Sequence, residues 1–229
     1  MELTENKTLS NLYMMQHCDS FFPTGAVSFS WGLEALVNLR LVNDSRETNE
    51  FIISQVKSRW ANFDLPVLDY CSRGKHMSEI LYADQLVEAQ SLPKEQRQGS
   101  KKLGAAMLKT HQKLNTPGSD IFSDEIAKKH AFGHLSVVQG YIWQKLGFSS
   151  SQIKLMSAHC LCTGILGSAV RLSVIGFLDA QKLHTALQPI IQKLIDSPVA
   201  DIEKTNSFLP IIDIASMKHE TDDRRMFMN

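Results

Sequence analysis

Apolar residues recur at helical spacing along most of the 229-residue chain, and no segment alternates apolar and polar residues for long enough to build a sheet. The clearest apolar stripe comprises Phe51, Ile52, Val56, Trp60 and Phe63. It follows Asp44 and Glu47, which have the spacing of a capping box, and it ends at Pro66, which can open the next helix. The periodicity therefore predicts an all-α protein.

The same spacing predicts further helices. One helix is expected over residues 79–90, with Ser78 as its cap, and a second begins at Pro93. Three more are expected over residues 131–146, 150–176 and 179–195, and Pro189 should kink the last of them. Residues 156–170 form the longest uncharged run, which is shorter than the roughly 18 to 20 apolar residues that a membrane span requires. We expect this run to be a buried central helix and expect no membrane association.

The composition is that of an ordinary globular protein. Hydrophobic residues make up 43% of the chain, and 24 Lys and Arg balance 24 Asp and Glu, so there is no excess of positive charge for general nucleic-acid binding. The N-terminal segment lacks the basic start and apolar run of a secretory signal, and the four cysteines are expected to be reduced thiols. These features favour a cytoplasmic protein.

Neither internal repeats nor low-complexity linkers divide the chain. We predict a flexible N-terminal arm over residues 1–10, one helical-bundle domain over 11–196 and a C-terminal docking tail over 197–229. After the last expected helix, the tail has an apolar block and a charged end; its apolar residues include Leu209, Ile211, Ile212, Ile214 and Met217. Such a segment either folds back onto its own domain or docks on a partner.

Small residues recur at spacings that place them on one helix face. The pairs are Ser28 and Gly32, Ser100 and Gly104, Gly133 and Gly140, and Gly164 and Ser168. A glycine inside a helix costs about 0.5 to 1 kcal/mol relative to alanine, so repeated use indicates close backbone contact. Packing within the core is favoured over contact with a partner.

The segment from Gly99 to Gly104 has the glycine spacing of a phosphate-binding loop, but Ala105 and Ala106 follow where Lys and Ser or Thr are required. We therefore expect no nucleoside triphosphate at this segment. The nearby basic residues Arg97, Lys101, Lys102 and Lys109 are typical of a solvated helix face, although they could meet an acidic partner.

Histidines and cysteines suggest a metal site only weakly. His130 and His134 lack the central Glu of a metalloprotease helix, and a buried cysteine such as Cys160 or Cys162 usually behaves as a small hydrophobic residue. We predict no metal and no cofactor on this chain. The alternative is a small helical metal-dependent enzyme that uses His159, Cys160 and Cys162.

Candidate catalytic residues are equally sparse. His17 and Asp19 precede a loop, FFPTG, that could expose them, but the chain has no GxSxG elbow. Asp19 is better explained as a cap or turn residue before Pro23 and Gly25. We expect the protein not to be an enzyme.

Five ordered segments resemble the UreF family of urease accessory proteins. They are Asp19–Gly25 with Ser28–Glu34; Leu92–Arg97 with Gly99, Ser100, Leu103 and Gly104; His134 with Val138, Gly140 and Gly147; Ala169–Leu172 with Gly176 and Gln181; and Pro210–Glu220 with Arg225 and Phe227. The resemblance spans almost the whole chain. It departs from the family pattern in the late helix, at Ser168, Val174, Phe177 and Ala180.

The resemblance implies an all-α bundle that forms a homodimer and acts as a non-enzymatic adaptor. UreF proteins bridge a second accessory protein, UreD or UreH, and the GTPase UreG on apo-urease, and so assist nickel insertion. Nickel and GTP are then expected on the partners. We further expect residues 207–229, with residues 1–10, to be loosely held until they settle against the UreD-like partner.

Given these partners, two hypotheses of our own place the contacts on particular residues. Contact with the UreD-like or UreH-like partner is expected at Phe208, Leu209, Ile211, Ile212, Ile214, Met217, Arg225 and Phe227. Contact with the GTPase, or with a second subunit, is expected at Glu34, Arg97, Lys101 and Arg171. A structural role is expected for the signature residues Pro23, Gly25, Ser28 and Gly32.

Overall fold

The computed structural model describes residues 7–207, 209–219 and 226–228. The helices, in chain order, are α1 (Lys7–Cys18), α2 (Leu33–Asn38), α3 (Ser45–Ser54), α4 (Leu65–Arg73), α5 (Met77–Gln90), α6 (Lys94–Lys113), α7 (Ser119–Ala127), α8 (Leu135–Lys145), α9 (Ser150–Arg171), α10 (Phe177–Asp196) and α11 (Pro210–His219). Two 3₁₀ turns, η1 (Ala26–Ser28) and η3 (Ile202–Lys204), and one π-helical segment, η2 (Gln55–Asp64), connect them. No strand occurs in the described ranges, and the all-α prediction is confirmed.

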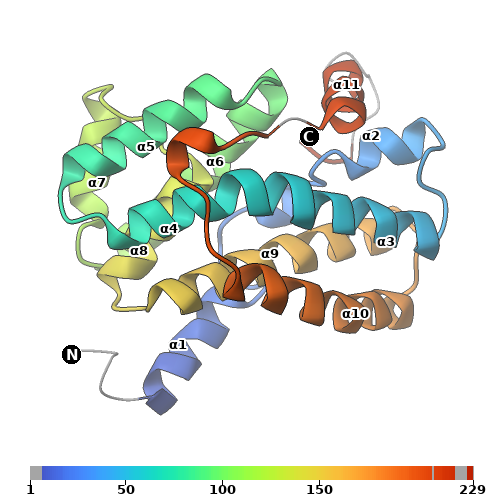
Figure 1. Cartoon of the computed structure of the whole chain (residues 1–229), viewed down its shortest axis with the longest axis horizontal. Coiled ribbons are helices and arrows are strands. Elements are labelled where there is room, and N and C mark those ends of the chain that lie inside the picture. Colours follow the sequence, from blue (N-terminus) through green and yellow to red (C-terminus); the bar gives the residue numbers. More distant parts are fainter. Residues whose placement is uncertain (1–6, 208, 220–225, 229) are drawn as a thin grey trace.

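Helix α9 runs through the centre of the molecule, as predicted (Figure 1). Its N-terminal half supplies Ile153 and Met156 to a core cluster built mainly by α4, α5, α6 and α8. Its C-terminal half supplies Cys162 and Ile165 to a second cluster built mainly by α2, α3, η2 and α10. Among the described helices, only α9 is long and apolar enough to span a membrane, and half of its most apolar window is buried inside the protein, as in a core helix.

The apolar stripe of residues 51–63 is buried along its whole length. The capping residue Asp44 accepts a hydrogen bond from the Glu47 amide at 2.8 Å and so starts α3. Pro66 lies in the first turn of α4, but Asp64 and Leu65 before it already have helical backbone angles, so the helix continues from η2 into α4. The Asn62 carbonyl, four residues before Pro66, accepts a hydrogen bond from the Asn206 amide at 3.1 Å instead. The cap at Asp44 is confirmed, whereas the helix does not end at Pro66 as expected.

Several predicted helix boundaries were wrong. The helix expected from residue 131 begins at Leu135, because Gly133 has a φ of +76° and the Asp84 carboxylate accepts hydrogen bonds from the amides of Phe132, Gly133 and His134. Helix α5 begins one residue before its expected cap, with His76 at the capping position.

The chain also forms a helix after residue 195, where none was expected. Pro210 is the first residue of α11, and the Asp213 carboxylate accepts a hydrogen bond from the Leu209 amide at 3.1 Å. Helix α11 packs against α2 and α6, and it buries Ile212 and Ala215. The segment before it is also packed, because Ile202, Thr205 and Ser207 are buried.

The small helical residues serve close packing within the chain. A Cβ at Gly104 would lie 2.0 Å from the carbonyl oxygen of Gly133, and one at Gly164 would lie 2.5 Å from the Trp31 ring. Ser168 donates a hydrogen bond to the Phe29 carbonyl at 2.9 Å. Gly32 and Gly133, by contrast, have positive φ angles and form turns rather than helix faces.

Candidate functional site

Residues 226–228, near the C-terminus, are hydrogen-bonded to the signature segment, by which we mean residues 19–34. The Glu34 carboxylate is 3% exposed and accepts hydrogen bonds from the amides of Met226 and Phe227, at 2.6 and 2.9 Å. The Met228 amide donates to the Ser28 carbonyl at 2.8 Å. A carboxylate that accepts two amides makes stronger hydrogen bonds than a neutral acceptor.

Arg171 completes this attachment from α9. Its guanidinium lies 4.4 Å from the centre of the Phe227 ring and donates to the carbonyls of Val27 and Gly167. Phe227 is 3% exposed, so it is a core residue of the chain. We call the contacts of Ser28, Glu34 and Arg171 with residues 226–228 the C-terminal clasp.

The tail residues divide into two groups. Ile212 and Phe227 are buried against the chain's own domain, and Leu209 is half-buried. Ile211, Ile214 and Met217 lie on the outer face of α11 and are 68%, 57% and 50% exposed. Of the two interpretations of the tail, folding back therefore applies to the first group, whereas the second group remains accessible. Phe208 and Arg225 lie outside the described residues.

The signature segment forms a turn that rests on α6. Asp19 accepts a hydrogen bond from the Phe21 amide at 2.7 Å, which confirms its role as a turn residue. The Pro23 carbonyl accepts a hydrogen bond from Thr110 at 3.0 Å, and Gly25 has a φ of +75°. This turn places Phe22 beside the stacked rings of His17 and His111.

Arg97 and Lys101 are both engaged within the chain. Arg97 donates to the carbonyls of Ser91 and Leu92 at 2.7 and 2.8 Å, and Lys101 forms an ion pair with Glu88 at 3.0 Å. They hold the turn between α5 and α6, while part of each side chain stays exposed. Contact with a GTPase or a second subunit remains a prediction for these residues, as for Glu34 and Arg171.

The side chains of His159, Cys160 and Cys162 do not converge on one site. Cys160 packs on the first core cluster, as does Cys18, whereas Cys162 is buried in the second cluster. The His159 ring lies 5.2 Å from the His184 ring. Burial raises the pKa of Cys162 to about 12, so this thiol stays protonated. In the described ranges no three His, Cys, Asp or Glu side chains are arranged to hold a metal ion.

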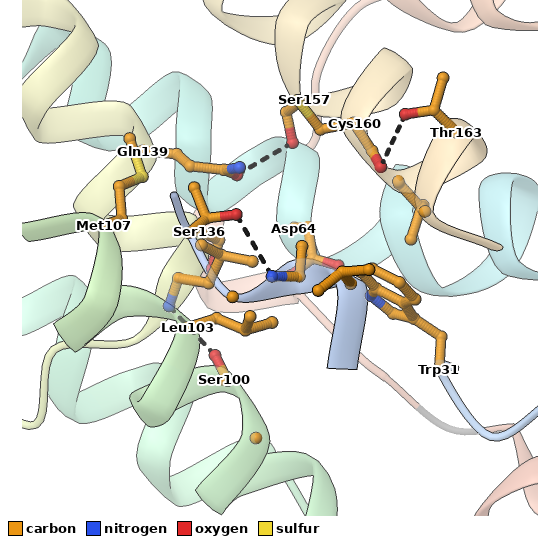
Figure 2. A pocket seen from close by; sticks show the side chains of 18 of the residues that line it. Trp31, Asp64, Ser100, Leu103, Met107, Ser136, Gln139, Ser157, Cys160 and Thr163 are labelled. Atoms are coloured by element: carbon orange, nitrogen blue, oxygen red, sulfur yellow. Dashed lines mark hydrogen bonds between the residues drawn. The ribbon is translucent and has the colours of Figure 1, made fainter. Parts of the chain in front are cut away.

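A cavity of about 670 Å³ lies between the signature segment and helices α6, α8 and α9, with η2 forming another side. Figure 2 shows Trp31 across this cavity from Met107 and Gln139. Ser157 accepts a hydrogen bond from the Trp60 indole and donates one to Gln139, both at 3.2 Å. The sequence predicted no cavity, because its lining residues come from segments far apart in the chain.

A charged pair, Arg59 and Asp64, lines the same cavity, with Arg59 Nε 3.4 Å from Asp64 Oδ2. Burial raises the pKa of Asp64, and the Arg59 charge opposes this rise. Arg59 also donates to Gln96 at 2.8 Å, and Gln96 in turn donates to Asp213 of α11 at 3.1 Å. The wall of the cavity is thus connected to the C-terminal helix by one continuous polar chain.

Comparison with known proteins gives one consistent result. The model of the UreF family matches residues 42–188. Proteins named urease accessory protein UreF are similar to this chain over nearly its whole length: that of Trichodesmium erythraeum is 30% identical, with 95% of this chain and 96% of that protein covered. Those of Actinobacillus pleuropneumoniae and Corynebacterium efficiens are each 26% identical, with 92% and 95% of this chain and 95% and 96% of those proteins covered. The chain therefore belongs to the UreF family.

Proposed function

We propose that this chain is a non-enzymatic adaptor in urease maturation, which bridges a UreD-like or UreH-like protein and a UreG-like GTPase on apo-urease during nickel insertion. Its family membership supports this role. In this proposal the chain acts in the cytoplasm as a homodimer, and nickel and GTP are bound by its partners.

The outer face of α11 carries the proposal. Ile211, Ile214 and Met217 project from a helix whose inner face is held by the buried residues Ile212 and Asp213. A single exposed apolar side chain is ordinary on a protein surface, but three on one short helix form a patch that a partner can cover. Helix α11 is already formed and packed on α2 and α6, in contrast to the loosely held segment expected from the sequence, so a partner gains this apolar contact without the entropic cost of ordering the segment.

We assign this patch to the UreD-like partner. The buried members of the tail do not face a partner, because Ile212 packs into the second core cluster and Phe227 is held by the C-terminal clasp. Substituting Ile212 should therefore weaken folding and binding together, whereas substituting Ile214 should affect binding alone. Phe208 and Arg225 remain predicted contacts.

The test is co-expression with UreD-like and UreG-like proteins and apo-urease, followed by measurement of complex formation and nickel-dependent urea hydrolysis. We expect Ile211→Asp with Ile214→Asp to weaken binding of the UreD-like protein at least tenfold and to reduce urease activation. Leu12→Asp, at an exposed apolar position on α1, is the matched control. Normal binding by the double variant would reject the α11 docking surface.

The candidates Glu34 and Arg171 act in this proposal through the C-terminal clasp. Arg171→Ala should release Phe227 and disturb the support of the docking surface, so complex formation should fall. Unchanged complex formation and urease activation would remove Arg171 from the residues that matter for assembly.

A further inference from the structure

We propose that the cavity between the signature segment and α9 is a binding site for an uncharged amphipathic small molecule, with an apolar body and a carbonyl or hydroxyl oxygen that accepts hydrogen bonds. This inference goes beyond the adaptor function and does not depend on it. The cavity volume of about 670 Å³ lies within the range of small-molecule sites in proteins.

The depth of the cavity indicates a small molecule rather than part of a folded partner. Several residues that line it belong to the interior: Trp60 and Trp143 are each 1% exposed, and Met107 is fully buried. The surface of a folded protein cannot reach this depth, whereas a slender molecule can enter between the helices.

The apolar part of the lining is mostly aromatic and aliphatic. Trp31, Phe22, Leu103 and Leu161 join the two interior tryptophans and Met107 around the space. Apolar and aromatic walls of this kind favour the burial of an apolar molecular body.

The balance of charges in the cavity lining favours an uncharged ligand. The charged residues that line the cavity are two arginines, Arg59 and Arg171, and two aspartates, Asp19 and Asp64, so their formal charges cancel. His17 also lines the cavity, and burial lowers its pKa, which favours its neutral form. A ligand with a net charge would introduce a buried charge without a counter-ion, which is costly.

An unused hydrogen-bond donor, the Trp143 indole, indicates the acceptor group of the ligand. The indole Nε1 of Trp143 is buried and has no hydrogen-bond partner in the described part of the chain, whereas Arg59 Nε faces the Asp64 carboxylate at 3.4 Å. Buried N–H groups are normally satisfied, so the unpartnered indole of a residue that lines the cavity matches a molecule that brings an acceptor oxygen.

Gly167 marks the entrance. It lies on α9, it is exposed, and it lines the cavity, yet a Cβ at this position would have no heavy atom within 4 Å. A helical glycine without a steric reason costs stability, and here it leaves the entrance open. A large side chain at position 167 therefore fits without a steric clash at its Cβ, and it should obstruct the entrance to the cavity.

The three tryptophans of the chain all line the cavity, so tryptophan emission reports on its contents. The probe is prodan, an uncharged naphthyl ketone, with 1-anilinonaphthalene-8-sulfonate as its anionic counterpart. We expect prodan to quench the tryptophan emission by energy transfer, to saturate at one molecule per chain, and to bind at least tenfold more tightly than the anion.

Gly167→Phe should weaken prodan binding at least tenfold, whereas Ala105→Phe, at an exposed position of α6 outside the cavity lining, should leave binding unchanged. Circular dichroism checks that both variants fold. If Gly167→Phe does not fold, Gly167→Leu and the titration of the wild-type protein carry the test.

Two results would overturn the proposal. Absence of saturable quenching would show that the cavity holds only water, and equal binding of prodan by the Gly167 variant would show that the probe binds to the surface. Because partner assembly is measured separately, neither result bears on the adaptor function.

Discussion

Gly104 of α6 lies against Gly133 so closely that a Cβ on Gly104 would be 2.0 Å from the Gly133 carbonyl oxygen. This backbone contact allows α6 to approach the turn that precedes α8. The obstructing atom belongs to the backbone, so it cannot move away as a flexible side chain could. The same turn is held from the other side by the buried carboxylate of Asp84.

Gly104→Ala should therefore lower the free energy of unfolding by about 3 kcal/mol, because an added methyl group overpacks this contact. The matched variant is Gly167→Ala on α9, where a Cβ meets nothing within 4 Å. That change should raise the free energy of unfolding by about 0.5 to 1 kcal/mol through helix propensity alone. Urea denaturation followed by circular dichroism measures both values, and equal effects would contradict the packing described for Gly104.

The C-terminal clasp makes a second prediction. Glu34→Ala removes the acceptor for the amides of Met226 and Phe227, so residues 226–228 should detach from the domain. Amide hydrogen exchange at these residues should become at least tenfold faster, since exchange follows local opening. The control is Glu203→Ala, which removes an exposed carboxylate from η3.

Retention of slow exchange in the Glu34 variant would mean that the Phe227 ring, with the hydrogen bond from the Met228 amide to the Ser28 carbonyl, holds residues 226–228 without Glu34. Phe227→Ala should then release them, whereas Met228→Ala should not, because Met228 is 46% exposed.

Stability should fall as the solution becomes acidic, because the stacked imidazoles of His17 and His111 are buried, at 4% and 0% exposed. Burial, with a smaller contribution from His17, lowers the pKa of His111 to about 3, and burial also lowers that of His17. The unfolded chain binds protons near pH 6.5 and the folded chain does not, so stability is lost as pH falls from about 6.5 toward 3.

Each of these two histidines should contribute up to about 1.4 kcal/mol of lost stability per pH unit within its range. Urea denaturation at pH 7.5 and pH 5 measures the loss, and His111→Gln should make the dependence on pH shallower. A variant with the same pH dependence as the wild type would show that His111 does not carry this effect. His130, which is exposed and paired with Glu125, provides the control substitution.

Much of the fold could be predicted from local sequence. Three such features depend on residues a few positions apart: the stripe of residues 51–63, the cap at Asp44 and the turn at Asp19. The family was also indicated by short segments in order, and the comparisons confirm it. Helix α11 was missed because it is short and is stabilised mainly by packing against α2 and α6. The local sequence pattern does not show these contacts.

The sequence by itself determined that this chain is all-α, that its most apolar segment is a central helix, and that it belongs to one family. Only the tertiary structure decided that Glu34 binds the amide of Phe227, 193 positions away, and that the three tryptophans surround one cavity. The physical reason is that helical periodicity is a property of neighbouring residues, whereas contacts between side chains depend on how whole helices pack. The spacing of small residues indicated a close contact at Gly104, but no local pattern identified the Gly133 carbonyl as the group that it approaches.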